Sequence, residues 1–153
     1  LLVGQVLKKI KNKEISIDKM VKKPLTKIFT DLFKFSYKGM DLVNNHKMLC
    51  NLMIYTLYKK HGKGLINNQE ALLSMADIII EIYANESGLL RSEKTNNKNH
   101  IKMSEFYLYE SNQKIKQKLY ELIDSSTTGI RRNILKRLVN KFTNHSHINP
   151  YSY

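Results

Sequence analysis

Two carboxylates one helical turn apart, Asp77 and Glu81, are the strongest candidates for chemistry in this sequence. At a spacing of four residues both lie on one face of an α-helix, where like charges repel each other. A partly buried carboxylate needs a cation or hydrogen-bond donors to remain ionised. Either lysine and arginine side chains of flanking helices neutralise the pair, or the pair performs acid–base catalysis. We expect the first and keep the second as the alternative.

No other residue pattern predicts a catalytic, cofactor-binding or metal-binding site. A di-iron centre in a helical bundle needs Glu-x-x-His motifs, and the sequence contains none. His145 and His147 form only a weak metal pattern in a polar tail. Cys50, the single cysteine, lies in an apolar stretch and is expected to pack rather than react. His46 is expected to be a buried histidine that is satisfied by a hydrogen bond.

The acidic pair lies in an acidic segment of a strongly basic chain. The formal net charge is +13, of which residues 1–64 contribute +10, residues 65–93 contribute −4 and residues 94–153 contribute +7. Basic segments of this kind attract nucleic acid or anionic membranes, but they are also typical of solvated helix faces. No apolar run approaches the roughly 20 residues that span a bilayer. One cysteine excludes an intramolecular disulfide framework and fits a reducing compartment.

Hydrophobic spacing predicts an all-α protein, namely an up-and-down bundle of about four or five helices. Strand-like alternation is not sustained anywhere, and only two Pro and six Gly interrupt the chain. The helices are expected at about residues 39–61, 67–93, 101–124 and 129–142, after shorter helices within residues 1–36. Residues 94–100 are predicted to be a polar link, and residues 143–153 an irregular tail.

The segment 67–93 is apolar on most of its circumference. Such a helix is usually packed from more than one side, so we predict that it is the central helix, enclosed by its neighbours. The apolar residues expected to be covered include Leu73, Ile80, Tyr83 and Leu90. Its one polar edge would be the line of residues Glu70, Ser74, Asp77, Glu81, Asn85 and Ser92.

The last predicted helix is basic and amphipathic. Its apolar face, which includes Ile130 and Ile134, is expected to complete the bundle. The residues expected to point outward, as a membrane or partner face, are Arg131, Arg132, Lys136, Arg137 and Lys141. A basic amphipathic helix is typical of contact with an anionic membrane, and equally of a solvated surface. No helix-turn-helix spacing or aromatic stacking pattern supports nucleic-acid binding.

The sequence resembles the C-terminal extension of acyl-CoA dehydrogenases of the very-long-chain type over residues 37–153, most strongly over residues 60–94. The residues that carry the resemblance are Lys60, Gly62, Lys63, Gln69, Leu72 or Leu73, Ala76, Asp77, Glu81, Tyr83, Ala84, Leu90, Arg91, Asn149 and Pro150. The apolar beginning, which lacks an initiator Met, is similar to the segment directly after the dehydrogenase core in such enzymes. Residues 1–36 are then expected to be a linker with short helices after an absent core, and residues 37–153 the helical domain.

The resemblance implies a parent FAD enzyme of fatty acid β-oxidation. In that family a glutamate base removes the α-proton of an acyl-CoA while the β-hydride passes to flavin, and the base and nearly all flavin contacts belong to the core. This segment would then hold no cofactor and no catalytic residue. Asp77, Glu81 and Arg91 would form a structural polar seam, and the partners would be the dehydrogenase core, a second copy and an anionic membrane surface. Expected localisation is cytoplasmic, peripheral to the inner membrane where it docks; a free-standing basic helical protein that binds nucleic acid or membranes is the alternative.

Overall fold

Four α-helices and one short 3₁₀-helix make up the computed structural model of this chain, which describes residues 39–144. The elements are α3 Gly39–His61, η1 Gly62–Asn67, α4 Gln69–Thr95, α5 Lys98–Ser126 and α6 Gly129–Thr143. Residues 39–144 contain no strand, and the predicted all-α bundle is confirmed. The helices expected within residues 1–36 and the tail after residue 144 lie outside the described residues.

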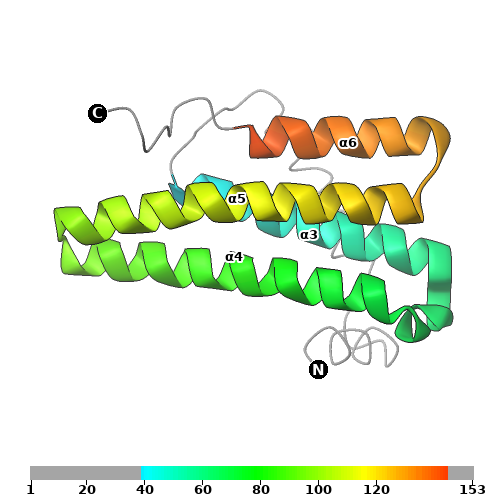
Figure 1. Cartoon of the computed structure of the whole chain (residues 1–153), viewed down its shortest axis with the longest axis horizontal. Coiled ribbons are helices and arrows are strands. Elements are labelled where there is room, and N and C mark those ends of the chain that lie inside the picture. The colour runs from blue at the N-terminus through cyan, green and yellow to red at the C-terminus, as the bar shows by residue number, and fades with distance from the viewer. Residues whose placement is uncertain (1–38, 145–153) are drawn as a thin grey trace.

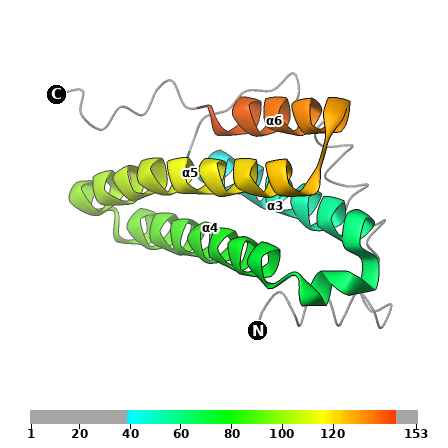
Figure 2. The same cartoon turned by 45° about the vertical axis from the view of Figure 1, so that its right-hand side comes forward.

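The four helices form an up-and-down bundle (Figure 1). Successive helices run in opposite directions and are joined by short connections, as the turned view also shows (Figure 2). α3 and α5 pack against each other, and both α4 and α6 pack against this pair from opposite sides. The central layer is therefore α3 with α5, and α4 and α6 are the outer helices.

Asparagine and glycine set the helix ends. Gly62 follows α3 with a φ of 53°, a conformation that glycine adopts without strain. The Asn68 side chain caps α4 by accepting a hydrogen bond from the Ala71 amide. Asn96 ends α4 in the left-handed conformation, and Asn97 caps α5 directly afterwards. The polar link expected over residues 94–100 is therefore shorter than predicted. Most of its polar residues belong to the ends of α4 and α5, and only Asn96 and Asn97 lie between the two helices.

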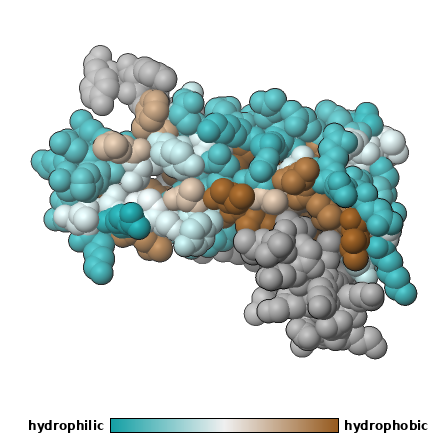
Figure 3. Space-filling model, turned by 60° about the horizontal axis from the view of Figure 1, so that its bottom comes forward, coloured by the Kyte–Doolittle hydropathy of each residue, from teal (hydrophilic) through white to brown (hydrophobic). Residues whose placement is uncertain are grey.

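The prediction that 67–93 is an enclosed central helix is wrong. α4 buries one side against α3 and α5, while Leu73, Ile80, Tyr83 and Leu90 on its other side are exposed by 66%, 60%, 72% and 53%. Figure 3, in which the underside of Figure 1 comes forward, shows strongly hydrophobic residues together on the face that contains α4. Apolar residues around a helix indicate that other protein segments can pack on all its sides, but not that these segments belong to the same domain.

The expected burial of Ile130 and Ile134 is also wrong. Their exposures are 79% and 53%, whereas Leu135, Val139 and Phe142 form the buried side of α6. α6 carries two sets of apolar residues, and the set that includes Phe142 packs on the core. Ile130 and Ile134 therefore share the outer face of α6 with basic residues.

A buried polar network joins three helices at the centre of the bundle. His46 of α3 is completely buried, and its Nε2 lies 2.8 Å from Oδ1 of Asn112 of α5. The Asn112 Nδ2 donates to the Thr143 carbonyl at 2.9 Å. This carbonyl lies in the last turn of α6, where backbone acceptors have no partner inside the helix. Asn112 thus fixes the end of α6 to α3 and α5, and the expectation for His46 is confirmed.

Replacement of Asn112 by Ala is expected to destabilise the domain by about 2 to 4 kcal/mol, because His46 and the Thr143 carbonyl both lose a buried hydrogen-bond partner. Urea denaturation followed by circular dichroism measures the free energy of unfolding. The matched control is Gln113→Ala, the next residue on α5, which is exposed and should change stability by no more than about 0.5 kcal/mol. Equal stability of the two variants would contradict a structural role for this network.

Candidate functional site

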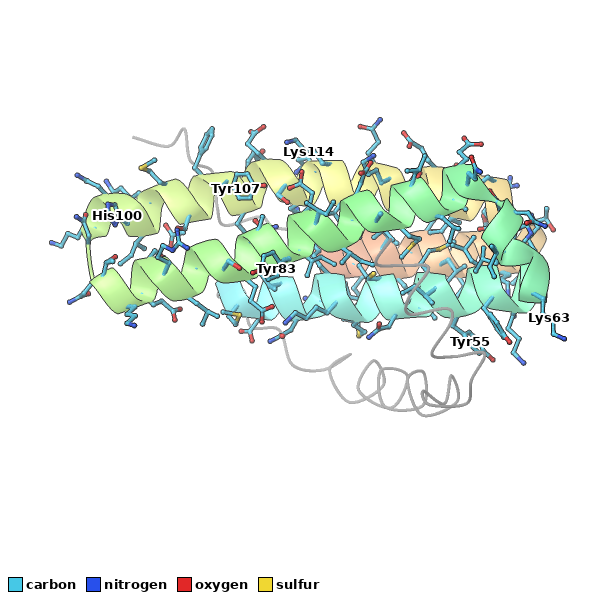
Figure 4. The ribbon with its side chains drawn as sticks, turned by 90° about the horizontal axis from the view of Figure 1, so that it is seen from below. Tyr55, Lys63, Tyr83, His100, Tyr107 and Lys114 are labelled. Carbon is cyan, nitrogen blue, oxygen red and sulfur yellow. The ribbon has the colours of Figure 1, made fainter. Side chains whose placement is uncertain are left out.

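Glu81 lies in a polar seam between α4 and α5. Its Oε2 accepts hydrogen bonds from the Tyr107 hydroxyl at 3.0 Å and the Ser111 hydroxyl at 2.8 Å. The Lys114 ammonium lies 3.8 Å from Oε1, and the Glu81 side chain is only 19% exposed. Tyr107 and Lys114 project from α5 beside α4 (Figure 4). The carboxylate is therefore held by two hydroxyl donors and a nearby cation.

The polar seam continues inward from Glu81. Nδ2 of Asn85, a buried residue of α4, donates to the Ser111 hydroxyl at 2.7 Å, and this hydroxyl in turn donates to Glu81. Sequence reasoning missed Ser111 and Asn112 as members of polar networks. Helical spacing could have indicated both residues, because they occupy core positions of α5 between the buried residues Leu108 and Ile115.

Two other acids of α4, Asp77 and Glu86, are also paired across helix boundaries. Asp77 lies 2.8 Å from the Lys118 ammonium of α5, and Glu86 forms an ion pair with Lys47 of α3. Asp77 and Glu81 thus each have a lysine of α5 nearby, as the expectation of cationic neighbours requires. Arg91 is exposed on the side of α4 that also carries Asp77 and Glu81, and it lies beside Met103 and His100 of α5. The described residues offer Arg91 no hydrogen bond or ion pair, so the contacts of the polar seam involve the two carboxylates and not Arg91.

The electrostatics of the polar seam favour structure over turnover. Burial, the hydrogen bond to Glu81 and the charge of Glu81 raise the pKa of Tyr107 above its ordinary value of 10.0. Tyr107 therefore stays protonated and donates to the carboxylate.

Burial raises the pKa of the Cys50 thiol to about 12, which removes the thiolate that a nucleophile needs. The expectation that Cys50 packs in the core is confirmed.

The five basic residues predicted on the last helix do not act alike. The Arg132 Nε and the Lys136 ammonium lie 3.5 Å and 2.7 Å from the Asp124 carboxylate of α5, and the Lys136 ammonium also lies over the Tyr120 ring. These two side chains are engaged within the domain. Arg131 and Arg137 are exposed, and Lys141 is half-buried.

Comparison with known proteins identifies the helical domain. The family described as acyl-CoA dehydrogenase, C-terminal domain, matches residues 45–141, which reach from α3 into α6. The chain belongs to this family. A search of curated proteins gave no match.

A solved structure shares the fold of this acyl-CoA dehydrogenase C-terminal domain. It is an acyl-CoA dehydrogenase complexed with FAD from Bacillus anthracis, with a TM-score of 0.87 and 24% sequence identity. The match covers 96% of this chain and 27% of that chain. The domain therefore spans about a quarter of the length of the dehydrogenase whose fold it matches.

An apolar groove of about 380 Å³ lies between α3 and α4 of the acyl-CoA dehydrogenase C-terminal domain, with Ile54, Ile79 and Tyr83 in its lining. This volume is at the low end of the roughly 300–1,000 Å³ typical of ligand sites. The lysine that lines the groove, Lys47, is already paired with Glu86. The groove therefore does not fit FAD, whose pyrophosphate needs several donors.

Neither a metal centre nor a membrane span is found within residues 39–144. No group of three or more His, Cys, Asp or Glu side chains in this range could hold a metal ion. None of the helices described is both long and apolar enough to cross a bilayer.

Neutralising Glu81 by Glu81→Gln is expected to lower the pKa of Tyr107 toward its ordinary value. Burial contributes most to the raised pKa of Tyr107, and the Glu81 contact contributes the rest. The contact therefore stabilises the fold at neutral pH, and this contribution is lost as the pH rises above the ordinary pKa of 10.0. Tyrosinate absorbance measured against pH reports the shift, and Tyr107→Phe identifies which transition belongs to this residue. Glu93→Gln, the same charge change at an exposed position of α4, should leave the transition in place; an unchanged transition in Glu81→Gln would refute the contact.

Proposed function

We propose that this chain is the noncatalytic C-terminal helical domain of an FAD-dependent acyl-CoA dehydrogenase of the very-long-chain type, which acts in fatty acid β-oxidation. The family match over residues 45–141 supports a dehydrogenase domain. The fold match to about a quarter of a dehydrogenase that is complexed with FAD supports a larger parent protein in which flavin chemistry belongs to another part. The domain packs on that catalytic core.

The engagement of the α4 carboxylates is the observation that carries the noncatalytic assignment. A general base has to reach its substrate proton with a free lone pair. Glu81 already accepts two hydroxyl hydrogen bonds and is largely buried, and Asp77 is paired with Lys118. These residues consequently hold α4 on α5, and the base and the flavin lie in the core.

An antibody raised against this chain tests the assignment in the organism that produces it. The expected immunoblot band has three to four times the 17.9 kDa mass of this chain, and the immunoprecipitate should contain FAD. The isolated 153-residue protein should show no flavin absorbance after incubation with FAD. A native band at the mass of the chain alone would instead support the free-standing basic protein.

The outer face of α6 supports an additional role at an anionic membrane. Ile130 and Ile134 are exposed on this face, where apolar side chains can enter the headgroup region. Arg131 and Arg137 are exposed on the same helix, and each basic residue near an anionic surface contributes about 1 kcal/mol. This combination of apolar and unengaged basic residues favours lipid over nucleic acid, since phosphate binding alone would not need the isoleucines.

Co-sedimentation with vesicles that contain anionic lipid tests this role. The variant Ile130→Ser/Ile134→Ser/Arg131→Gln/Arg137→Gln should pellet with vesicles at least about tenfold more weakly than the unmodified chain, because both the apolar and the electrostatic contacts are lost. Lys63→Gln/Lys98→Gln removes the same number of charges at exposed positions outside α6 and is the matched control. Equal pelleting of both variants would remove α6 as the membrane face. Arg132 and Lys136 stay unchanged, because both are paired with Asp124.

A further inference from the structure

The exposed side of α4 carries a regular apolar seam. Residues Leu73, Ala76, Ile80, Tyr83, Ser87 and Leu90 follow each other at alternating intervals of three and four. This is the spacing by which one helix packs along another as a coiled coil. The four large members are all more than half exposed, so the apolar seam has no cover among residues 39–144. Figure 4, viewed from below, shows α4 in front of the bundle, with Tyr83 on it.

The apolar seam reads almost the same in both directions. From its centre, between Ile80 and Tyr83, each half continues with a small residue, Ala76 or Ser87, and ends with a leucine. Two copies of α4 that run antiparallel therefore pair Leu73 with Leu90, Ala76 with Ser87, and Ile80 with Tyr83. The small residues face each other, which allows the helices to approach closely. A surface with this internal symmetry suits the twofold contact of an isologous dimer.

Charge at the ends of the apolar seam selects the antiparallel arrangement. Glu70 and Arg91 both lie on the α5 side of α4, because they are seven and fourteen residues from Asp77, which pairs with Lys118 of α5. A twofold axis perpendicular to the helices places the α5 sides of both copies together, so Glu70 of one copy lies beside Arg91 of the other. A parallel twofold pair would instead place the two α5 sides on opposite flanks of the contact and Glu70 and Arg91 at opposite ends of it, so Glu70 of one copy would not meet Arg91 of the other. Arg91 thereby gains the partner that residues 39–144 do not provide.

We infer that the outer face of α4 is a self-association surface, on which a second copy of this chain docks antiparallel through Leu73, Ile80, Tyr83 and Leu90. This contact between two copies involves neither a flavin core nor a membrane. Stable interfaces bury about 1,200–2,000 Å², and a seam along one helix is at the small end of this range. The dimer is therefore weak, and it strengthens with added salt because each copy carries a net charge of +13.

Analytical ultracentrifugation of the 153-residue protein over a concentration series measures this dimer. The variant Ile80→Ser/Tyr83→Ser is expected to raise its Kd more than about tenfold, while its circular dichroism stays unchanged because both side chains are exposed. Ile130→Ser/Ile134→Ser removes two exposed isoleucines from the opposite helix, α6, and should leave the Kd unaltered. A protein that stays monomeric throughout the series, or a Kd that is insensitive to the α4 variant, overturns the inference.

Disulfide formation tests the antiparallel register. Ala76→Cys and Ser87→Cys proteins, mixed under mild oxidation, should form the mixed dimer, whereas each alone should not, because the two positions lie roughly 16 Å apart along a helix. Cys50 is buried with a raised pKa and does not interfere. Self-linking of Ala76→Cys as fast as the mixture would show a parallel pair and overturn the register. Failure of both tests leaves the dehydrogenase domain assignment intact, because that assignment depends on the size and flavin content of the native protein.

Discussion

The bundle depends on two adjacent buried polar residues of α5. Ser111 points to α4, where it joins Asn85 to Glu81, and Asn112 points to α3 and α6, where it joins His46 to the Thr143 carbonyl. A buried polar group without a partner costs about 1 to 3 kcal/mol, so a slip of any helix along α5 would break several hydrogen bonds together. Apolar packing among leucines tolerates such a slip much better. The two side chains consequently fix the relative positions of all four helices.

The charge pattern of the chain follows from this arrangement. α4 is the acidic helix of a basic protein, and its acids meet lysines from both central helices, Lys118 and Lys114 of α5 and Lys47 of α3. Exposed ion pairs each contribute little, roughly 0 to 1 kcal/mol. Their main effect is directional, because an acidic helix docks on lysine-rich neighbours in one orientation and leaves its uncharged side outward. The apolar seam of α4 is therefore exposed because the three acids that form ion pairs, Asp77, Glu81 and Glu86, turn toward α3 and α5.

Most of the fold could be predicted from the sequence, and the orientation of the outer helices could not. Helical spacing and turn residues located α3 and α6 closely, because glycine and hydroxyl or amide caps end helices by local chemistry. Local chemistry also explains why His46 and Cys50 were interpreted correctly. Ile80 and Ile130 were placed inside because hydrophobicity indicates that a side chain avoids water, but not which molecule covers it. Asn112 was missed because its partners are distant in sequence and only the packed helices bring them together.

The two outer faces have independent consequences, because α4 and α6 lie on opposite sides of the α3–α5 pair. A dimer that pairs α4 with α4 directs its two α6 faces away from each other. In this proposed dimer one flat bilayer would meet only one α6 face at a time. The proposed lipid contact would therefore gain nothing from the multivalency that two coplanar faces would provide. Salt separates the two contacts further, since screening weakens attraction to anionic lipid but relieves repulsion between two basic copies. In these two proposals the same charge of the chain opposes the dimer and drives the lipid contact, so ionic strength would select between them.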